Sequence, residues 1–294
     1  MNVTNAMNFV SVDEFRRHLE ELPPGVFLQN GPQYQVLGVP LQVVSKSAAA
    51  TQDSVVLFIF HGALDQSKRA IPFFEHAYSP ATECGQFTTV ISVADPSLRL
   101  DKALMFTWYA GDHEIDTIAV LSSVVDAVYG LYPKSRFVFF GGSSGARPAL
   151  ALSHRIPDSW CQLINPLAFI GYNKVDMDRY VAACWPDGPN SRGTTIGDPV
   201  ADLYRKGHSN WVLVLQNAFD KHLAPSILPF LSIAFQNSNR FILLSSFYPE
   251  MLRHDFPWPD AKVWRRQRCL SSFTGKLSLQ CGSGSGRPSS AERG

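Results

Sequence analysis

The stretch from Arg136 to Leu152 reads RFVFFGGSSGARPALAL and is the most informative part of the sequence about the fold. Its first five residues form an apolar run of the kind found in strands that are buried on both faces. The next five residues, Gly141 to Gly145, fit the pattern G-x-S-x-G with Ser143 at the centre. The residues after them begin with small side chains and can continue as a helix. This order of strand, tight turn and helix is what a strained nucleophilic serine requires.

Similar apolar runs lie on both sides of this stretch and alternate with helical patterns. We expect strands at 34–37, 41–44, 55–60, 87–93, 136–140, 161–164, 211–215 and 241–244. We expect helices near 68–78, 114–131, 145–154 and 222–236. The alternation predicts an α/β fold with a mostly parallel sheet, whose neighbouring strands are joined by right-handed crossovers.

The ends of the chain differ from the middle. Near the N-terminus, Ser11 followed by Glu14 predicts the capped start of a short helix, which Pro23 ends. We therefore divide the chain into an N-terminal helix and hairpin start (1–39), an α/β domain (40–274) and a disordered Gly/Ser-rich tail (275–294). Residues 172–207 lack a clear strand pattern, and they could form a cap insertion over the carboxyl ends of the strands.

The composition excludes several classes of protein. The chain has 294 residues, 45% hydrophobic and 17% charged, with a net charge of +1, so it can bury a sizeable core and has no basic field for nucleic acid. Its mean hydropathy is −0.04 and its apolar runs are far too short for a transmembrane segment. The five scattered cysteines contain no CxxC pair, and the N-terminus does not read as a signal peptide. We expect a cytoplasmic protein with no metal and no cofactor.

The candidate partners of Ser143 follow two later strands. Asp220 comes after the run WVLVL, and His254 lies in the longer segment after FILL. Both lie beyond strand carboxyl ends, and the order serine, acid, histidine is that of an α/β-hydrolase triad. The sequence thus predicts a triad of Ser143, Asp220 and His254. Two alternatives stay open: His222 as the base or a substrate residue, and Ser144 as the nucleophile.

An oxyanion hole requires two main-chain N–H groups aimed at the developing negative charge. One would come from Ser144, directly after the nucleophile. The other would come from the loop after VVLFIF, where Gly62 permits close approach and Ala63 supplies the N–H. We predict His61, Trp108 and His222 as substrate-binding residues, although His61 could instead be hydrogen-bonded inside the protein.

Together, His61-Gly62 after a strand, GGSSG around Ser143, Asp220 and His254 resemble the α/β-hydrolase superfamily over roughly residues 40–270. The resemblance implies a central sheet of about eight mostly parallel strands with helices on both faces. It also implies serine-based acyl transfer through an acyl-enzyme, without a cofactor. Arg253 departs from the family, in which a small residue usually precedes the histidine. The stretches FHGALD, ISVADPSL, FFGGSSGARPAL and INPLAFIGYN are also similar to bacterial hydrolase-like proteins linked to surface glycan biosynthesis.

These observations favour a serine hydrolase that acts on an ester or thioester. It could be an esterase or an acyltransferase that acts on a glycan. Its partner would be a small-molecule or glycan-linked ester. The alternative is a non-catalytic binding or scaffold protein in a glycan-assembly complex that uses the same fold. A third hypothesis is phosphate or sugar-nucleotide binding at the GGSSG turn and the helix that follows it.

Overall fold

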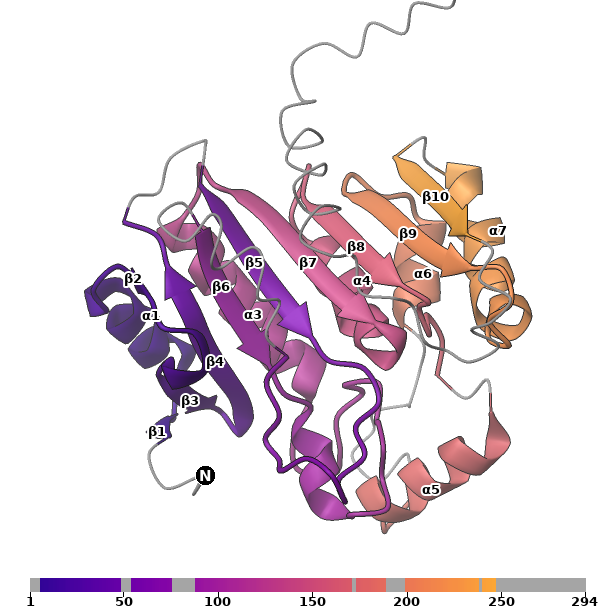
Figure 1. Cartoon of the computed structure of the whole chain (residues 1–294), viewed down its shortest axis with the longest axis horizontal. Helices are drawn as coiled ribbons and strands as arrows, with labels where there is room; N and C mark the ends of the chain where they lie inside the picture. Colours follow the sequence, from indigo (N-terminus) through magenta and orange to yellow (C-terminus); the bar gives the residue numbers. More distant parts are fainter. Residues whose placement is uncertain are drawn as a thin grey trace, which may run out of the picture. The chain divides into compact units, whose positions relative to one another are not determined.

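A computed structural model of the chain describes residues 6–48, 54–75, 88–170, 173–188, 199–237 and 240–246, all within one compact unit (1–256). Ten strands of these residues form a single sheet in the order β1-β3-β4-β6-β5-β7-β8-β9-β10, with β2 paired to β4 (Figure 1). Their bounds are Met7–Phe9 (β1), Gly25–Val26 (β2), Gln33–Val36 (β3), Val39–Lys46 (β4), Val55–Phe60 (β5), Thr88–Val93 (β6), Arg136–Gly142 (β7), Trp160–Ile164 (β8), Trp211–Asn217 (β9) and Phe241–Ser246 (β10).

The sheet is parallel from β6 to β10, with β4 antiparallel to its neighbours β3 and β6. Strand β5 lies between β6 and β7, and its last residue, Phe60, is level with Val93 and Gly141. Because parallel neighbours end at the same edge of a sheet, the segments after β5, β6, β7, β8 and β9 meet there. This carboxyl edge is where the sequence places every candidate site residue.

Five helices form a row along one face of the sheet: α1 (Val12–Glu21), α3 (Thr117–Leu131), α4 (Ala146–Ser153), α6 (Pro199–Arg205) and α7 (Leu228–Asn237) (Figure 1). The mostly parallel α/β sheet predicted from the sequence is thus confirmed. The resemblance also implies helices on the second face of the sheet, and the described residues form none there. The helix expected at 68–78 does not form over 68–75, which the structure shows as turns and coil, and 76–78 lie outside the described residues.

The N-terminal elements follow local rules. The Ser11 hydroxyl accepts a hydrogen bond from the Glu14 N–H at 3.2 Å, which caps α1 as predicted. The hairpin of β3 and β4 turns at Leu37 and Gly38, which both have positive φ. Strand β1, with three residues, is too short for a recognisable pattern and was not predicted.

The core has two parts. The larger contains the sheet and its row of helices, and Phe58 and Phe139 stack within it at 5.4 Å between ring centroids. The smaller lies beyond the carboxyl edge, where α5 (Lys174–Cys184) is found (Figure 1). Helix α6, also within the range 172–207, packs against α4 and α7 through Val200 and Tyr204, so it is a core helix and not a cap. No helix of the described residues is long and apolar enough to cross a membrane.

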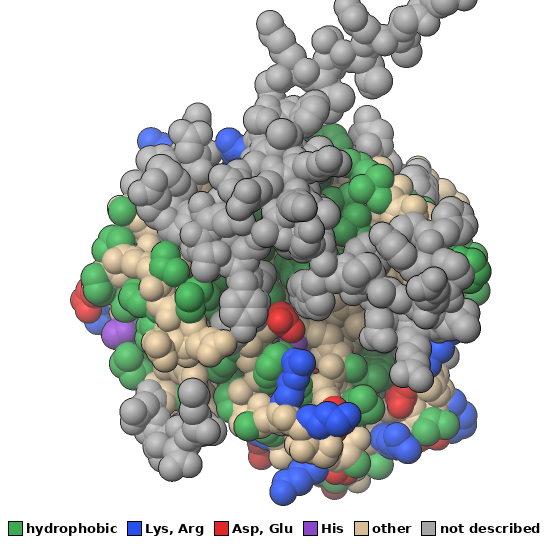
Figure 2. Space-filling view, in the orientation of Figure 1, with side chains coloured by type: hydrophobic (Ala, Val, Ile, Leu, Met, Phe, Trp, Pro, Cys, Tyr) green, Lys and Arg blue, Asp and Glu red, His purple; other side chains and the backbone are tan. Residues whose placement is uncertain are grey.

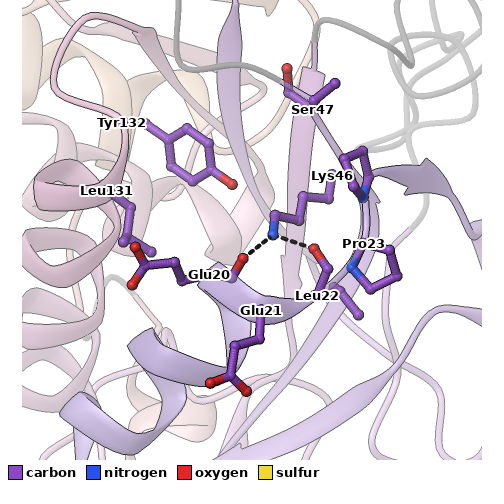
Figure 3. A pocket seen from close by; sticks show the side chains of 10 residues that line it. Glu20, Glu21, Leu22, Pro23, Lys46, Ser47, Leu131 and Tyr132 are labelled. Carbon is purple, nitrogen blue, oxygen red and sulfur yellow. Dashed lines mark hydrogen bonds between the residues drawn. The ribbon is translucent and has the colours of Figure 1, made fainter.

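A pocket of about 340 Å³ opens at the other edge of the sheet, where β4 ends (Figure 3). The Lys46 ammonium donates hydrogen bonds to the Glu20 carbonyl at 2.7 Å and to the Leu22 carbonyl. These carbonyls end α1, where a cation is favourable because it faces the negative end of the helix dipole. Burial lowers the pKa of Lys46. The buried lysine therefore serves to hold α1 against the sheet.

Candidate active site

Ser143 sits on a strained turn at the carboxyl end of β7. Its φ is +52°, in the left-handed region that costs a residue with a side chain about 1–2 kcal/mol. It begins a short 3-10 turn, Ser143–Gly145, that leads directly into α4. Its side chain is partly exposed, whereas Ser144 is buried, so Ser143 is the residue that can meet a ligand. The rival nucleophile Ser144 faces inward.

The flanking glycines make this turn possible. A Cβ at Gly141 would lie 2.1 Å from the Gly145 carbonyl oxygen. A Cβ at Gly145 would lie 2.5 Å from the Phe60 carbonyl oxygen and 2.6 Å from that of His61. Both positions therefore exclude any side chain, because the obstacle is main chain that cannot move aside. The two glycines of the G-x-S-x-G pattern are therefore required by the close packing of β7, β5 and the start of α4.

The backbone conformation of Ser143 makes a prediction about stability. At this position we expect Ser143→Gly to be more stable than Ser143→Ala by about 1 kcal/mol, because only glycine adopts the left-handed conformation without a steric cost. Urea denaturation of the two variants measures the difference. Both lack the hydroxyl, so the comparison isolates the backbone. An alanine variant as stable as the glycine variant would show that the turn carries no strain.

The loop after β5 lies against the serine. A Cβ at Gly62 would be 3.2 Å from the Ser143 Cβ and 3.1 Å from the Gly142 carbonyl oxygen. The next residue, Ala63, is exposed, and its N–H donates to no acceptor among the described residues. The Ser144 N–H is at the start of the 3-10 turn, where N–H groups have no partner within the helix. The two N–H groups predicted for an oxyanion hole thus come from segments in contact with Ser143.

His61 fixes the orientation of this loop. The Asp95 N–H donates to Nε2 of His61 at 3.1 Å, so that nitrogen carries no proton. The proton is then on Nδ1, which donates to the Gly62 carbonyl oxygen at 2.7 Å. Because C=O and N–H point in opposite directions across a trans peptide, the Ala63 N–H points away from the imidazole. Both ring nitrogens bond to main chain and the side chain is buried, which favours the structural alternative for His61, and its contact with substrate stays a prediction.

Asp95 connects the loop after β5 with the loop after β6. Its carboxylate accepts hydrogen bonds from the Thr107 hydroxyl at 2.6 and 2.7 Å and from the Tyr109 N–H at 3.1 Å. The Tyr109 hydroxyl in turn accepts from the His61 N–H and donates to the Val93 carbonyl. Burial raises the pKa of Asp95 and lowers the pKa of His61, which favours the neutral imidazole that the hydrogen bonds require.

Trp108 lies inside this network and not on a pocket wall. Trp108 and Tyr109 both have positive φ, 53° and 54°, a strained pair that the Asp95 carboxylate and Arg147 hold in place. Arg147 is buried in the first turn of α4, and its Nη1 donates to the Trp108 carbonyl oxygen at 3.2 Å. The indole ring is fully buried and packs edge-on against Tyr180 of α5. Its ring thus belongs to the smaller core, which does not favour the substrate-binding role, and that role stays an untested prediction.

Asp220 and His222 form a buried pair after β9. The Asp220 Oδ1 is 3.0 Å from Nδ1 of His222 and accepts the His222 N–H at 2.9 Å. His222 caps the short π-helical segment η5 (Leu223–Ile227) that leads into α7. His222 is thus a buried residue at the start of a helical segment, and its roles as base or substrate residue stay predictions. His254 lies outside the described residues.

The segment after β8 connects the serine turn to the neighbourhood of Asp220. The Leu167 N–H donates to the Ser143 carbonyl oxygen at 2.8 Å, and the Ala168 N–H donates to the Ser226 hydroxyl at 3.0 Å. Asn165 has a positive φ, and its side chain accepts the Asn217 N–H at the end of β9. Only the dipeptide Asn165-Pro166, typical of a turn, signals this role in the sequence.

Two pockets lined by described residues, one at Lys46 and one beside Arg99 and Pro96, do not include Ser143. Within the described ranges, no group of three His, Cys, Asp or Glu side chains is arranged to hold a metal ion.

Comparisons with known proteins place this geometry in a known fold. No family model matches the chain, and no curated protein matches it in sequence. Among solved structures, dipeptidyl peptidase 4 of Porphyromonas gingivalis superposes with a TM-score of 0.53 at 13% identity over 81% of this chain. The chain spans 34% of the length of that peptidase. The chain has the α/β-hydrolase fold. A second structure with this fold, the capsule O-acetyltransferase of Neisseria meningitidis serogroup A, has a TM-score of 0.51 at 12% identity and covers 87% of this chain and 99% of its own.

The α/β-hydrolase fold agrees with the site geometry derived above. Ser143 follows β7, the Gly62 loop follows the neighbouring β5, and Asp220 follows β9, two strands away on the other side.

Proposed function

We propose that this protein is a serine hydrolase that transfers an acyl group from an ester or thioester through a covalent acyl-enzyme on Ser143. The observation that carries the proposal is the strained, partly exposed Ser143 with the Gly62 loop in contact with it. A left-handed serine between two glycines that exclude any side chain costs stability, and strain of this kind is concentrated at functional sites.

The proposed reaction follows from the groups around the serine. The Ser143 hydroxyl attacks the acyl carbonyl carbon while a histidine removes its proton. The oxygen of the tetrahedral intermediate accepts hydrogen bonds from the N–H groups of Ala63 and Ser144, which His61 and the start of α4 hold in position. Collapse of the intermediate releases the alcohol or thiol, which takes the proton from the histidine. Water or an acceptor alcohol then attacks the acyl-enzyme by the same steps in reverse.

Asp220 is the proposed acid and His254 the proposed base. His222 is a rival base because its Nδ1 already contacts Asp220. We favour a positioning role for His222, since its own N–H and its side chain both bond to the same carboxylate oxygen in a local turn. That arrangement fixes the position of the Asp220 carboxylate at the start of η5.

The proposal extends to the acyl group and to the acceptor that receives it. One of the similar structures, which is matched over 99% of its own length, is named a capsule O-acetyltransferase. This supports an acyltransferase or esterase that acts on a glycan, with acetyl as the first acyl group to examine. Acetate release from phenyl acetate and acetyl transfer to an oligosaccharide acceptor, measured side by side, distinguish hydrolysis from transfer. No turnover of either kind by folded protein would overturn the proposal in favour of a non-catalytic scaffold.

The triad proposal predicts different effects for the two histidines. We expect His254→Ala to lower kcat about 10⁴-fold or more, and Asp220→Ala about 10⁴-fold, because both act on the proton of Ser143. We expect His222→Gln to lower kcat no more than about tenfold, since an amide can still donate to Asp220. Phenyl acetate hydrolysis and thermal unfolding of each variant make the comparison. If His222→Gln were as damaging as His254→Ala in folded protein, His222 would be the base.

A further inference from the structure

An unpaired arginine stands next to the oxyanion loop. Arg69 is exposed, and its guanidinium carbon lies 4.7 Å from the centroid of the Phe73 ring. Its side chain forms no ion pair and no hydrogen bond with any described residue. The adjacent Lys68 differs, because its ammonium is 2.9 Å from the Asp65 carboxylate. Arg99, on the loop after β6, is likewise paired with Asp112 and Glu114.

A chain of contacts links Arg69 to the reacting serine. Phe73, on which the guanidinium stacks, packs edge-on against the His61 ring at 5.7 Å between centroids. The His61 Nδ1 donates to the Gly62 carbonyl oxygen, and a Cβ at Gly62 would lie 3.2 Å from the Ser143 Cβ, so the two residues are close. The positive charge of Arg69 is also one of the influences that lower the pKa of His61. The guanidinium is therefore held close to the loop that carries His61 and Gly62.

Stacking prepares this guanidinium for a planar anion. An arginine on an aromatic ring has lost part of its rotamer freedom, so less is lost when it binds a ligand. Its edge presents parallel N–H donors that match a carboxylate or a phosphate in a two-bond geometry. Lys and Arg side chains also gather in the lower part of Figure 2, where the loops beyond the carboxyl edge of the sheet lie.

We propose that Arg69 binds a carboxylate or phosphate group of the substrate beside the reacting carbonyl, so that anionic esters are preferred over neutral ones. This inference deepens the proposed function and rests on it. Arg69 would be a substrate-binding residue that determines specificity, without a part in the chemical steps.

Three acetate esters and three variants test the inference. The esters are phenyl acetate, which is neutral, 3-acetoxybenzoate, which carries a carboxylate, and 3-acetoxyphenyl phosphate. We expect Arg69→Gln to lower kcat/KM for one or both anionic esters about tenfold, mainly through KM, and to leave phenyl acetate within about twofold. The arms for carboxylate and phosphate tell which anion is bound. Arg69→Lys should fall between, because it keeps the charge and loses the planar edge.

Lys68→Gln is the matched control. It removes one positive charge from the residue directly before Arg69 and should leave the preference for anionic esters unchanged. An equal loss for all three esters in Arg69→Gln would overturn the inference, because it would show a structural role for the loop. Two other results would also overturn the inference, provided that phenyl acetate is turned over. One is a wild-type protein that does not prefer anionic esters, and the other is a preference that is unchanged in Arg69→Gln. If folded wild-type protein turns over none of the esters, the proposed function fails and this inference fails with it.

Discussion

Replacing Ser143 by alanine is expected to lower ester hydrolysis by about four orders of magnitude or more, to the level left by binding and the oxyanion N–H groups. The hydroxyl is the group that forms the covalent intermediate, and no other described side chain at this turn can replace it, since Ser144 is buried. The loss should appear in kcat. Steady-state kinetics with phenyl acetate, with the background of host esterases removed by a second purification step, give the value.

Stability should hardly change in this variant. Ser143 is partly exposed, and alanine keeps its Cβ and backbone conformation. We expect the midpoint of thermal unfolding to stay within a few degrees of the wild type. Retention of more than a tenth of the wild-type activity in folded Ser143→Ala would contradict the assignment of the nucleophile.

Gly141→Ala is expected to cost about 4 kcal/mol or more of unfolding free energy, a large part of the 5–15 kcal/mol typical of a domain. The new Cβ would lie 2.1 Å from the Gly145 carbonyl oxygen and 2.8 Å from the Ala146 nitrogen. Relief requires a shift of α4 away from β7, and α4 packs against three strands of the sheet. Soluble yield and urea denaturation measure the effect.

Two other glycines supply controls. Gly142 is in the same motif, but its Cβ would meet only the Ile164 carbonyl oxygen at 3.8 Å, so Gly142→Ala should change stability by no more than about 1 kcal/mol. Gly130, exposed within α3, has open space around it, and Gly130→Ala should stabilise by about 0.5–1 kcal/mol through helix propensity. Equal losses for Gly141→Ala and Gly142→Ala would show that the packing described here is wrong.

Most of the sheet could be predicted from the sequence because its strands are buried on both faces. Runs such as those of β5 and β7 are continuous and apolar, and hydrophobic periodicity identifies them to within two residues. The turn at Ser143 was predictable for a different reason, since glycines flank a serine between a strand and a helix. The left-handed φ of that serine is the structural result of the same pattern.

The contacts beneath the site could not be predicted, because they join segments that are far apart in the chain. Asp95 holds Thr107 and Tyr109 through its carboxylate and His61 through its N–H, and no local pattern reveals such partners. A histidine beside a glycine is compatible with substrate contact or with a structural bond, and only the position of the Gly62 carbonyl decides between them. The burial of Trp108 was not predictable for a similar reason, since an aromatic residue near a site can belong to its wall or to the core below.

The catalytic and oxyanion assignments stay predictions, and labelling of the protein with a fluorophosphonate tests them most directly. Such reagents phosphonylate a serine only when a base activates it and an oxyanion hole accepts the developing charge. We predict a single adduct, located on Ser143 by mass spectrometry, that is absent in Ser143→Ala and strongly reduced in His254→Ala. An adduct on another serine, or no adduct on well-folded protein, would contradict the proposal that Ser143 is an activated nucleophile.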